Sequence, residues 1–242
     1  MARSAWPSGS TGMARSAWPS GSSGWATLRG HRGNAVRALG IAAVLWMALS
    51  PLAARSEPAG DDGPSRPRPA VLARGLAAYH RVEQAGLVRN ELLTIIDYAL
   101  PSSQRRLWVI DPASQRVLRR EYVAHGRGSS PEGDPDHAVR FSNDEGSHRS
   151  SLGTFLTGTV YPGEHGLSLE LVGLDTGLND HAALRRIVMH PAAYASADFR
   201  AKSGGRLGRS WGCPALDPAV ARSLIDRIED GSVVFADFGQ GG

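Results

Sequence analysis

Between residues 107 and 172, short apolar runs alternate with turn-forming residues, and this pattern restricts the fold more than any other feature of the chain. The runs 107–111 and 117–124 flank Asp-Pro-Ala-Ser, and the runs 155–161 and 167–172 flank Pro-Gly-Glu-His-Gly. Short apolar segments bounded by such residues are typical of strands joined in hairpins. The sequence therefore predicts a mostly β fold with flanking helices, of the α+β class.

Three other segments have the spacing of amphipathic helices. Residues 70–88 and 90–100 are predicted to be helical, the second because Leu92, Ile95, Ile96 and Ala99 recur at steps of three and four before Pro101. A third helix is predicted after Asp217, an N-cap followed by Pro218 in the first turn. Its apolar face comprises Val220, Leu224, Ile225 and Ile228, and residues 233–235 are predicted to form a final strand.

The first 69 residues differ in composition from the rest. Residues 1–10 recur at 13–22, so that Met13 offers an alternative start, and arginines then precede an uncharged run over 38–54. A basic region, an apolar region and small residues before a cleavage point are typical of a secretory signal, although a retained membrane anchor is the alternative. The expected organisation is a leader over 1–56, a tether over 57–69, a helical segment over 70–101 and a catalytic domain over 102–242.

The net charge of +4 belongs to this leader rather than to the folded part. Six of the 27 basic residues precede Glu57, the first acidic residue, which leaves 21 basic residues against 23 acidic ones. A nucleic-acid partner would require a basic face, so this class of function loses its support. Contact with a membrane is expected only through an uncleaved N-terminal segment.

The only cysteine, Cys213, lies in a glycine-rich polar segment, Gly-Arg-Leu-Gly-Arg-Ser-Trp-Gly-Cys-Pro-Ala. Such flanks are unusual for a buried structural cysteine, and the neighbouring Arg209 would favour the nucleophilic thiolate. Upstream, the run 187–189 predicts a short buried strand that ends in His190. A cysteine nucleophile needs a base within hydrogen-bonding reach, and a histidine at a strand end can provide one. The sequence therefore favours a Cys213–His190 catalytic pair over the alternatives, an inert buried cysteine and a histidine that caps a strand or bonds a carbonyl.

Several blocks around this pair resemble the YkuD-type murein L,D-transpeptidases, and they occur in the same order as in that family over about residues 90–240. The blocks are Arg-Leu-Trp-Val-Ile-Asp (106–111), Tyr-Val-Ala-His-Gly (122–126), Phe-Ser-Asn (141–143), Gly-Ser-His-Arg-Ser-Ser-Leu-Gly-Thr-Phe (146–155), Gly-Glu-His-Gly-Leu-Ser-Leu (163–169), Gly-Leu-Asn-Asp (177–180) and the cysteine segment (205–215). The resemblance implies a β-sandwich or barrel. The N-terminal segment, with its basic and apolar regions, predicts export to the periplasm or cell envelope.

The resemblance also implies an activity and a set of site residues. Cys213 matches the nucleophile, which forms a thioester with a peptidoglycan stem peptide, and His190 matches the base. Gly212 and Ser210 match the loop of the nucleophile, in which backbone N–H groups of Gly212 and Cys213 would form an oxyanion hole. No cofactor or metal is implied, and carbapenems are expected inhibitors. Hydrolysis of the same bond, an L,D-carboxypeptidase activity, is the alternative outcome.

Seven further residues are candidate substrate contacts, each with a structural role in the loops as the alternative. They are Arg209, Trp211, Asn143, Ser151, Thr154, His125 and His165. Two positions depart from the family pattern, because Trp211 stands where the family usually has His and Pro191 where it usually has Gly or Ser. These departures leave a catalytically silent peptidoglycan-binding module as a second hypothesis.

A metal site is a third hypothesis for the polar segment 126–151. It contains His137, Asp144, Glu145 and His148, a set that superficially resembles the ligands of zinc peptidases that act on cell-wall stems. Such mixtures of His, Asp and Glu are more often solvated loop residues. The hypothesis requires these side chains to converge at about 2.0–2.2 Å from one ion.

Overall fold

Eight strands form one sheet, in the order β3-β2-β1-β8-β4-β5-β6-β7, in the computed structural model, which describes residues 62–239. The strands are β1 Leu93–Asp97, β2 Leu107–Asp111, β3 Arg116–Glu121, β4 Gly153–Gly163, β5 Gly166–Gly173, β6 Val188–Pro191, β7 Ala215–Leu216 and β8 Val233–Asp237. Neighbouring strands are antiparallel except for two parallel pairs, β1–β8 and β6–β7. The mostly β class and both predicted hairpins, β2–β3 and β4–β5, are confirmed.

The central strands are buried on both faces. Along β8, Val233 and Phe235 point into one hydrophobic cluster, whereas Val234 and Ala236 point into another. The side chains of β2 also alternate between the two clusters, and Trp108 points into the first one. Because consecutive side chains of a strand point to opposite faces, a strand covered on both sides reads as a continuous apolar run.

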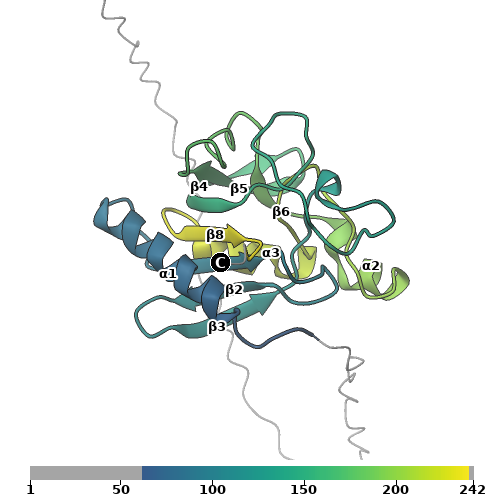
Figure 1. Cartoon of the computed structure of the whole chain (residues 1–242), viewed down its shortest axis with the longest axis horizontal. Helices are drawn as coiled ribbons and strands as arrows, with labels where there is room; N and C mark the ends of the chain where they lie inside the picture. Colours follow the sequence, from purple (N-terminus) through teal and green to yellow (C-terminus); the bar gives the residue numbers. More distant parts are fainter. Residues whose placement is uncertain (1–61, 240–242) are drawn as a thin grey trace, which may run out of the picture. The chain divides into compact units, whose positions relative to one another are not determined.

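Helix α1 (Pro69–Gln84) covers the first of these faces. Its buried residues Val71, Ala78, Tyr79 and Val82 pack against side chains of β1, β2 and β8. Pro69 stands in the first turn, where its missing N–H costs nothing. Figure 1 shows α1 at one end of the fold and the short helix α2 (Ala197–Lys202) at the other.

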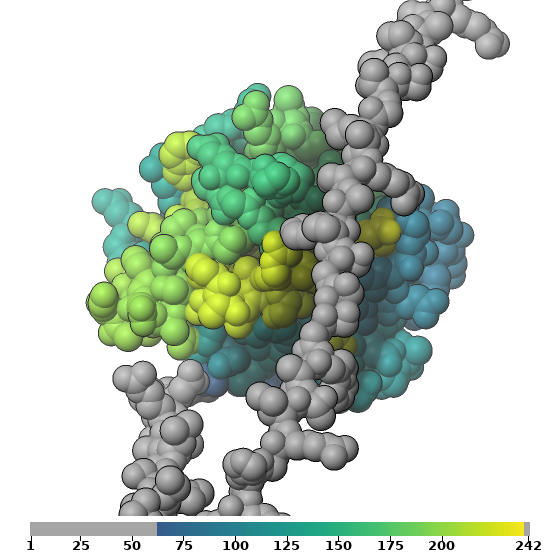
Figure 2. All heavy atoms as spheres, turned by 180° about the vertical axis from the view of Figure 1, so that it is seen from behind, coloured from purple at the N-terminus to yellow at the C-terminus, as the bar shows by residue number. Residues whose placement is uncertain are grey.

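Helix α3 (Pro218–Ile228) packs against the opposite face. The side chain of Asp217 accepts a hydrogen bond from the Ala219 N–H, which confirms the predicted N-cap, and Pro218 follows it. The buried residues are Ala221, Leu224, Ile225 and Ile228, so that Ala221 takes the place expected for Val220. Figure 2 shows the C-terminal segment in yellow at the surface, as the polar face of α3 requires.

The helix predicted over residues 90–100 is wrong, because this segment contains strand β1. All five residues of β1 are buried, and the strand pairs with β2 on one side and β8 on the other. A short apolar run that is buried on both faces cannot be distinguished from a buried helix by periodicity. The β-branched residues Thr94, Ile95 and Ile96 are the local signal for a strand.

Two short 3-10 segments complete the fold near the cysteine, Arg127–Ser129 and Ala193–Ala195. The predicted leader (1–56) and the first part of the predicted tether (57–61) lie outside the described residues. Within residues 62–239, no helix is long and apolar enough to cross a membrane.

Candidate active site

Parallel pairing of β6 and β7 brings the predicted catalytic pair onto adjacent strands. His190, near the end of β6, pairs with Ala215, two residues beyond Cys213. The backbone N–H of His190 donates to the Pro214 carbonyl oxygen at 3.4 Å. Histidine and cysteine, 23 positions apart in sequence, are thus carried by neighbouring segments of backbone.

His190 is only 2% exposed, and the orientation of its ring is set by the next residue in the chain. Nδ1 lies 2.9 Å from the Pro191 carbonyl oxygen, which can only accept, so Nδ1 carries the proton. Burial lowers the pKa of His190, an effect that the Pro191 hydrogen bond partly opposes. The ring is therefore neutral at pH 7, with the lone pair of a base on Nε2.

The Cys213 thiol is partly buried and is protonated at rest. Its Sγ donates a weak hydrogen bond to the Arg186 carbonyl oxygen at 3.7 Å. Burial raises the pKa of Cys213, whereas the Val188 N–H and the charge of Arg185 lower it. No hydrogen bond joins the thiol to the imidazole among residues 62–239, so the resting site holds a neutral thiol beside a neutral base.

Ser210 and Gly212 hold the nucleophile loop in shape. The Ser210 hydroxyl donates to the Cys213 carbonyl oxygen at 2.6 Å and accepts from the Gly212 N–H at 3.0 Å. Gly212 has φ +129°, and a Cβ there would lie 2.8 Å from the Arg149 carbonyl oxygen. Only glycine fits this position. The Gly212 N–H, expected from sequence to serve an oxyanion hole, donates to Ser210 in this structure, and its role toward an oxyanion stays a prediction.

Arg185, which was not predicted from sequence to belong to the site, holds the neighbouring loop beside this segment through hydrogen bonds. Its guanidinium donates to the carbonyl oxygens of Ser142 and Arg149, both at 2.6 Å, and to the Ser151 and Ser147 hydroxyls. A Cβ on Gly212 would lie 3.2 Å from Arg185 Nη2, so the cation touches the nucleophile loop. An arginine before a buried strand carries no sequence signal for this role, because its partners are mostly backbone oxygens from a distant loop.

His125 was expected to be a candidate substrate contact, but it is fully buried and supports the loop from inside. Its Nδ1 accepts from Arg106 at 2.7 Å, its Nε2–H donates to the Ser130 hydroxyl at 2.9 Å, and its carbonyl oxygen accepts from the Ser210 N–H. Burial, followed by the charge of Arg106, lowers the pKa of His125 to about 2. His125 is thus a neutral structural group, which corrects the expectation.

Three more candidate substrate contacts use their polar atoms within the protein. Asn143 bonds Asp180 and the His181 backbone, which ties two loops together. Thr154 is buried in β4 and accepts from Arg81 of α1. Ser151 is 5% exposed and accepts from Arg185. For these residues the structure favours the loop-stabilising alternative.

Arg209, Trp211 and His165 remain at the surface. His165, at the tip of the β4–β5 hairpin, stacks on the His190 ring with centroids 4.5 Å apart and planes at 27°. The hairpin tip therefore covers one face of the base. A substrate must approach His190 from the side that the His165 ring leaves open.

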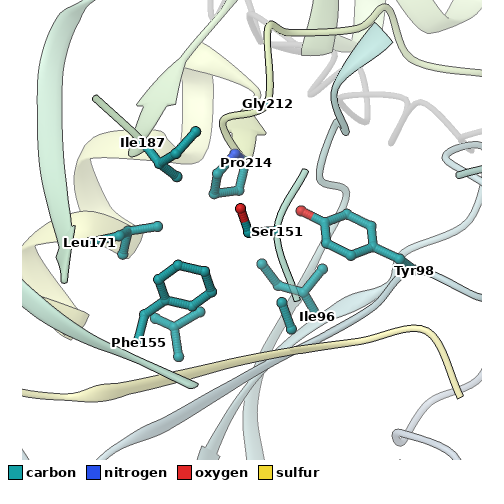
Figure 3. A pocket seen from close by; sticks show the side chains of 10 residues that line it. Ile96, Tyr98, Ser151, Phe155, Leu171, Ile187, Gly212 and Pro214 are labelled. Atoms are coloured by element: carbon teal, nitrogen blue, oxygen red, sulfur yellow. The ribbon is translucent and has the colours of Figure 1, made fainter. Parts of the chain in front are cut away.

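A small apolar cavity lies behind the nucleophile loop, within the core. Figure 3 shows the hydroxyls of Ser151 and Tyr98 turned toward its middle, beside Pro214. The lining residues are Ile96, Tyr98, Ser151, Phe155, Leu171, Ile187, Gly212, Pro214, Val234 and Ala236. Neither Cys213 nor His190 lines it, so this cavity belongs to the packing under the loop.

The fold does not bring the candidate metal ligands of the segment 126–151 together. His137 bonds Asp134, and His148 accepts from Arg127 and stacks on Trp211. Within the described range, no group of three or more His, Cys, Asp or Glu side chains is placed to hold a metal ion.

The buried neutral histidine leads to a prediction about stability. Below pH 6.5 the unfolded chain binds a proton at His125, whereas the folded chain does not until about pH 2, so acid destabilises the fold. From pH 7.5 to 5.0 this one group is expected to remove about 2 kcal/mol of the free energy of unfolding. Urea unfolding at both pH values is expected to show a smaller loss for His125→Gln than for the wild type. His80→Gln, at an exposed histidine of α1, is the control; equal losses in all three proteins would contradict the assignment.

The chain is similar to known proteins both in sequence and in structure. The model of the L,D-transpeptidase catalytic domain family (YkuD_2) matches residues 65–236. Among solved structures, an L,D-transpeptidase from Mycobacterium smegmatis is 17% identical, with 61% of this chain and 58% of that chain covered and a TM-score of 0.36. The L,D-transpeptidase from Xylanimonas cellulosilytica is 16% identical, with 75% and 100% covered and a TM-score of 0.36.

The helical cell shape determining protein Pgp2 from Campylobacter jejuni is 12% identical, with 68% of this chain and 56% of that chain covered and a TM-score of 0.39. The chain spans 58–59% of the length of the first two similar structures. No curated protein matches the sequence.

Proposed function

The chain belongs to the L,D-transpeptidase catalytic domain family, and from that membership we propose that it transfers an acyl group of a peptidoglycan stem peptide through Cys213. One observation carries the proposal: β6 and β7 place His190, with its proton fixed on Nδ1, beside the segment that holds the half-buried thiol. A neutral base beside a protonated thiol can activate the nucleophile when the substrate binds.

The reaction then runs in two halves. His190 Nε2 removes the proton from Cys213, and the sulfur forms a bond to the carbonyl carbon of the donor peptide. The Cys213 N–H is the remaining loop donor for the oxyanion, since the Gly212 N–H is bonded to Ser210. When the tetrahedral species collapses, the C–N bond breaks, His190 returns the proton to the departing D-amino acid, and a thioester remains.

The acceptor decides the product. An amine of a second stem peptide attacks the thioester, loses a proton to His190 and yields a cross-link together with the free thiol. Water in the same position yields the carboxypeptidase product. Both outcomes use the same residues, so product analysis by mass spectrometry distinguishes them.

A silent peptidoglycan-binding module is the second candidate, and two observations favour it. The raised pKa of Cys213 and the lack of a thiol–imidazole hydrogen bond among residues 62–239 are compatible with an inert cysteine. Catalytic hydrogen bonds are often long or absent before substrate binds, so the lack of this hydrogen bond does not count against the enzyme.

The proposed location is the cell envelope. The family acts on the cell wall, and the predicted signal within residues 1–56 provides a route of export; that segment lies outside the described residues. Contact with the membrane is proposed only for this N-terminal segment.

Incubation of the protein with a carbapenem tests the proposal. Imipenem is bound in the solved structure of the L,D-transpeptidase LdtMt1, so this class is a suitable acyl donor. We expect intact-protein mass spectrometry to show one covalent adduct, mapped by fragmentation to the peptide that contains Cys213. A protein that binds stem peptides but acquires no adduct, from either a carbapenem or a stem donor, would instead be a binding module.

A further inference from the structure

Trp211 presents its indole to solvent two residues before the proposed nucleophile. Its side chain is 69% exposed, the largest exposure among the large hydrophobic residues of the described range. Its neighbours are held firmly: the Ser210 N–H donates to the His125 carbonyl oxygen, and the Gly212 carbonyl oxygen accepts from Ser150. A single exposed indole is not by itself a binding site, but one fixed beside an exposed cation offers an apolar and a charged contact to a ligand.

Two side chains hold this indole in place. The His148 ring stacks on it, with centroids 5.0 Å apart and planes at 28°. The Arg127 guanidinium lies 5.5 Å from the indole centroid and donates to His148 Nδ1 at 3.0 Å. Arg127 is itself attached to the nucleophile loop, because its N–H donates to the Ser210 carbonyl oxygen at 2.8 Å. The three residues form an ordered aromatic and cationic surface, which we call the Trp211 platform.

The positive charge at this platform is not neutralised within the described residues. Arg127 forms no ion pair with a carboxylate within residues 62–239, although Asp144 and Glu145 lie on the loop before His148. Several arginines elsewhere do pair with a carboxylate, as in Arg68–Asp97, Arg74–Asp237 and Arg89–Asp230. An exposed cation beside an apolar surface can bind a ligand that has both an apolar part and a carboxylate.

We propose that the Trp211 platform binds the departing D-amino acid of the donor peptide, with its carboxylate on Arg127 and its side chain over the indole. This assignment rests on the proposed function. In the donor, this carboxylate lies one residue, about 3.5 Å of chain, from the reacting carbonyl. The platform is part of the nucleophile loop through Trp211 itself and through the hydrogen bond from the Arg127 N–H to the Ser210 carbonyl oxygen. The platform would therefore select donors with a free terminal carboxylate.

Two synthetic tetrapeptide stems, one ending in a carboxylate and one in a carboxamide, test the assignment. Their Kd values are measured on Cys213→Ala protein, which cannot turn them over. The acid is expected to bind about tenfold more tightly at low salt, because a charge-assisted hydrogen bond to Arg127 is lost in the amide. In the same background, Arg127→Gln is expected to abolish the difference, and Trp211→Ala to weaken both peptides alike.

Arg222→Gln is the matched control, because Arg222 is an exposed arginine of α3 that pairs with Asp226. Circular dichroism verifies that each variant is folded. An acid-to-amide preference that survives in Arg127→Gln, or that falls equally in Arg222→Gln, overturns the assignment.

Alkylation of Cys213 separates this assignment from the proposed function. The rate with anionic iodoacetate, divided by the rate with neutral iodoacetamide, is expected to fall several-fold in Arg127→Gln and in high salt. If the carbapenem acylates Cys213 but neither peptide binds, the platform assignment is wrong and the proposed function stands. If no acyl donor reacts with Cys213 but the preference for the acid peptide still depends on Arg127, the platform assignment is supported and the proposed acyl transfer is wrong.

Discussion

Replacement of Cys213 by alanine is expected to abolish acylation by a carbapenem and to reduce turnover of stem peptides by about 10⁴-fold or more. The thiol is the only cysteine sulfur in the chain, and His190 alone can deprotonate water but cannot form a thioester. Intact-protein mass spectrometry measures the adduct, and chromatography of the released D-amino acid measures turnover.

The fold of this variant is expected to remain. Cys213 is partly buried and packs at the edge of the main hydrophobic cluster, so loss of its sulfur should cost about 1 kcal/mol. The urea midpoint is the control measurement. Turnover retained by folded Cys213→Ala protein would refute the cysteine mechanism and direct attention to the polar segment that contains His137 and His148.

Replacement of Arg106 by methionine is expected to have the largest effect on stability, a loss of about 4 kcal/mol or more in the free energy of unfolding. Arg106 is fully buried, and its guanidinium donates to the carbonyl oxygens of Val123 and Leu100 and to His125 Nδ1. Methionine can fill the volume but leaves these three acceptors unpaired, and each unpaired buried acceptor costs about 1–3 kcal/mol.

Arg106→Lys and Arg119→Met are the comparison variants. Lysine retains the charge but lacks the planar guanidinium that donates to several acceptors at once. Arg106→Lys should therefore lose an intermediate amount of the free energy of unfolding. Arg119, on β3, is partly exposed and bonds Glu121 and Ser223, and its replacement should cost no more than about 1 kcal/mol. Equal urea midpoints for the wild type and Arg106→Met would show that the buried network does not stabilise the fold.

Two kinds of corrected expectation share one physical origin. Residues 90–100 were predicted to be helical because an apolar run looks the same in a buried strand and a buried helix; only pairing with β2 and β8 distinguishes them. Likewise, His125 and Thr154 have the residue types of substrate contacts, yet Arg106 and Arg81 take up their polar atoms. Partners distant in sequence decided both cases.

Local signals were sufficient where the structure depends on near neighbours. The Asp217 N-cap and the β2–β3 and β4–β5 hairpins follow from residues a few positions apart, and all were predicted. The strand that ends in His190 was also predicted, although its pairing with β7 was not.

The sequence by itself determined the mostly β class, the start of α3, the family and the candidate pair Cys213 and His190, because these depend on residue type and short-range spacing. Tertiary structure alone decided the surroundings of that pair. These are the hydrogen bonds from Arg185 to the neighbouring loop, the stacking of the His165 ring on His190 and the ordered Trp211 platform. Each of these contacts joins segments that are many residues apart, and short-range spacing carries no information about which such segments the sheet will bring together.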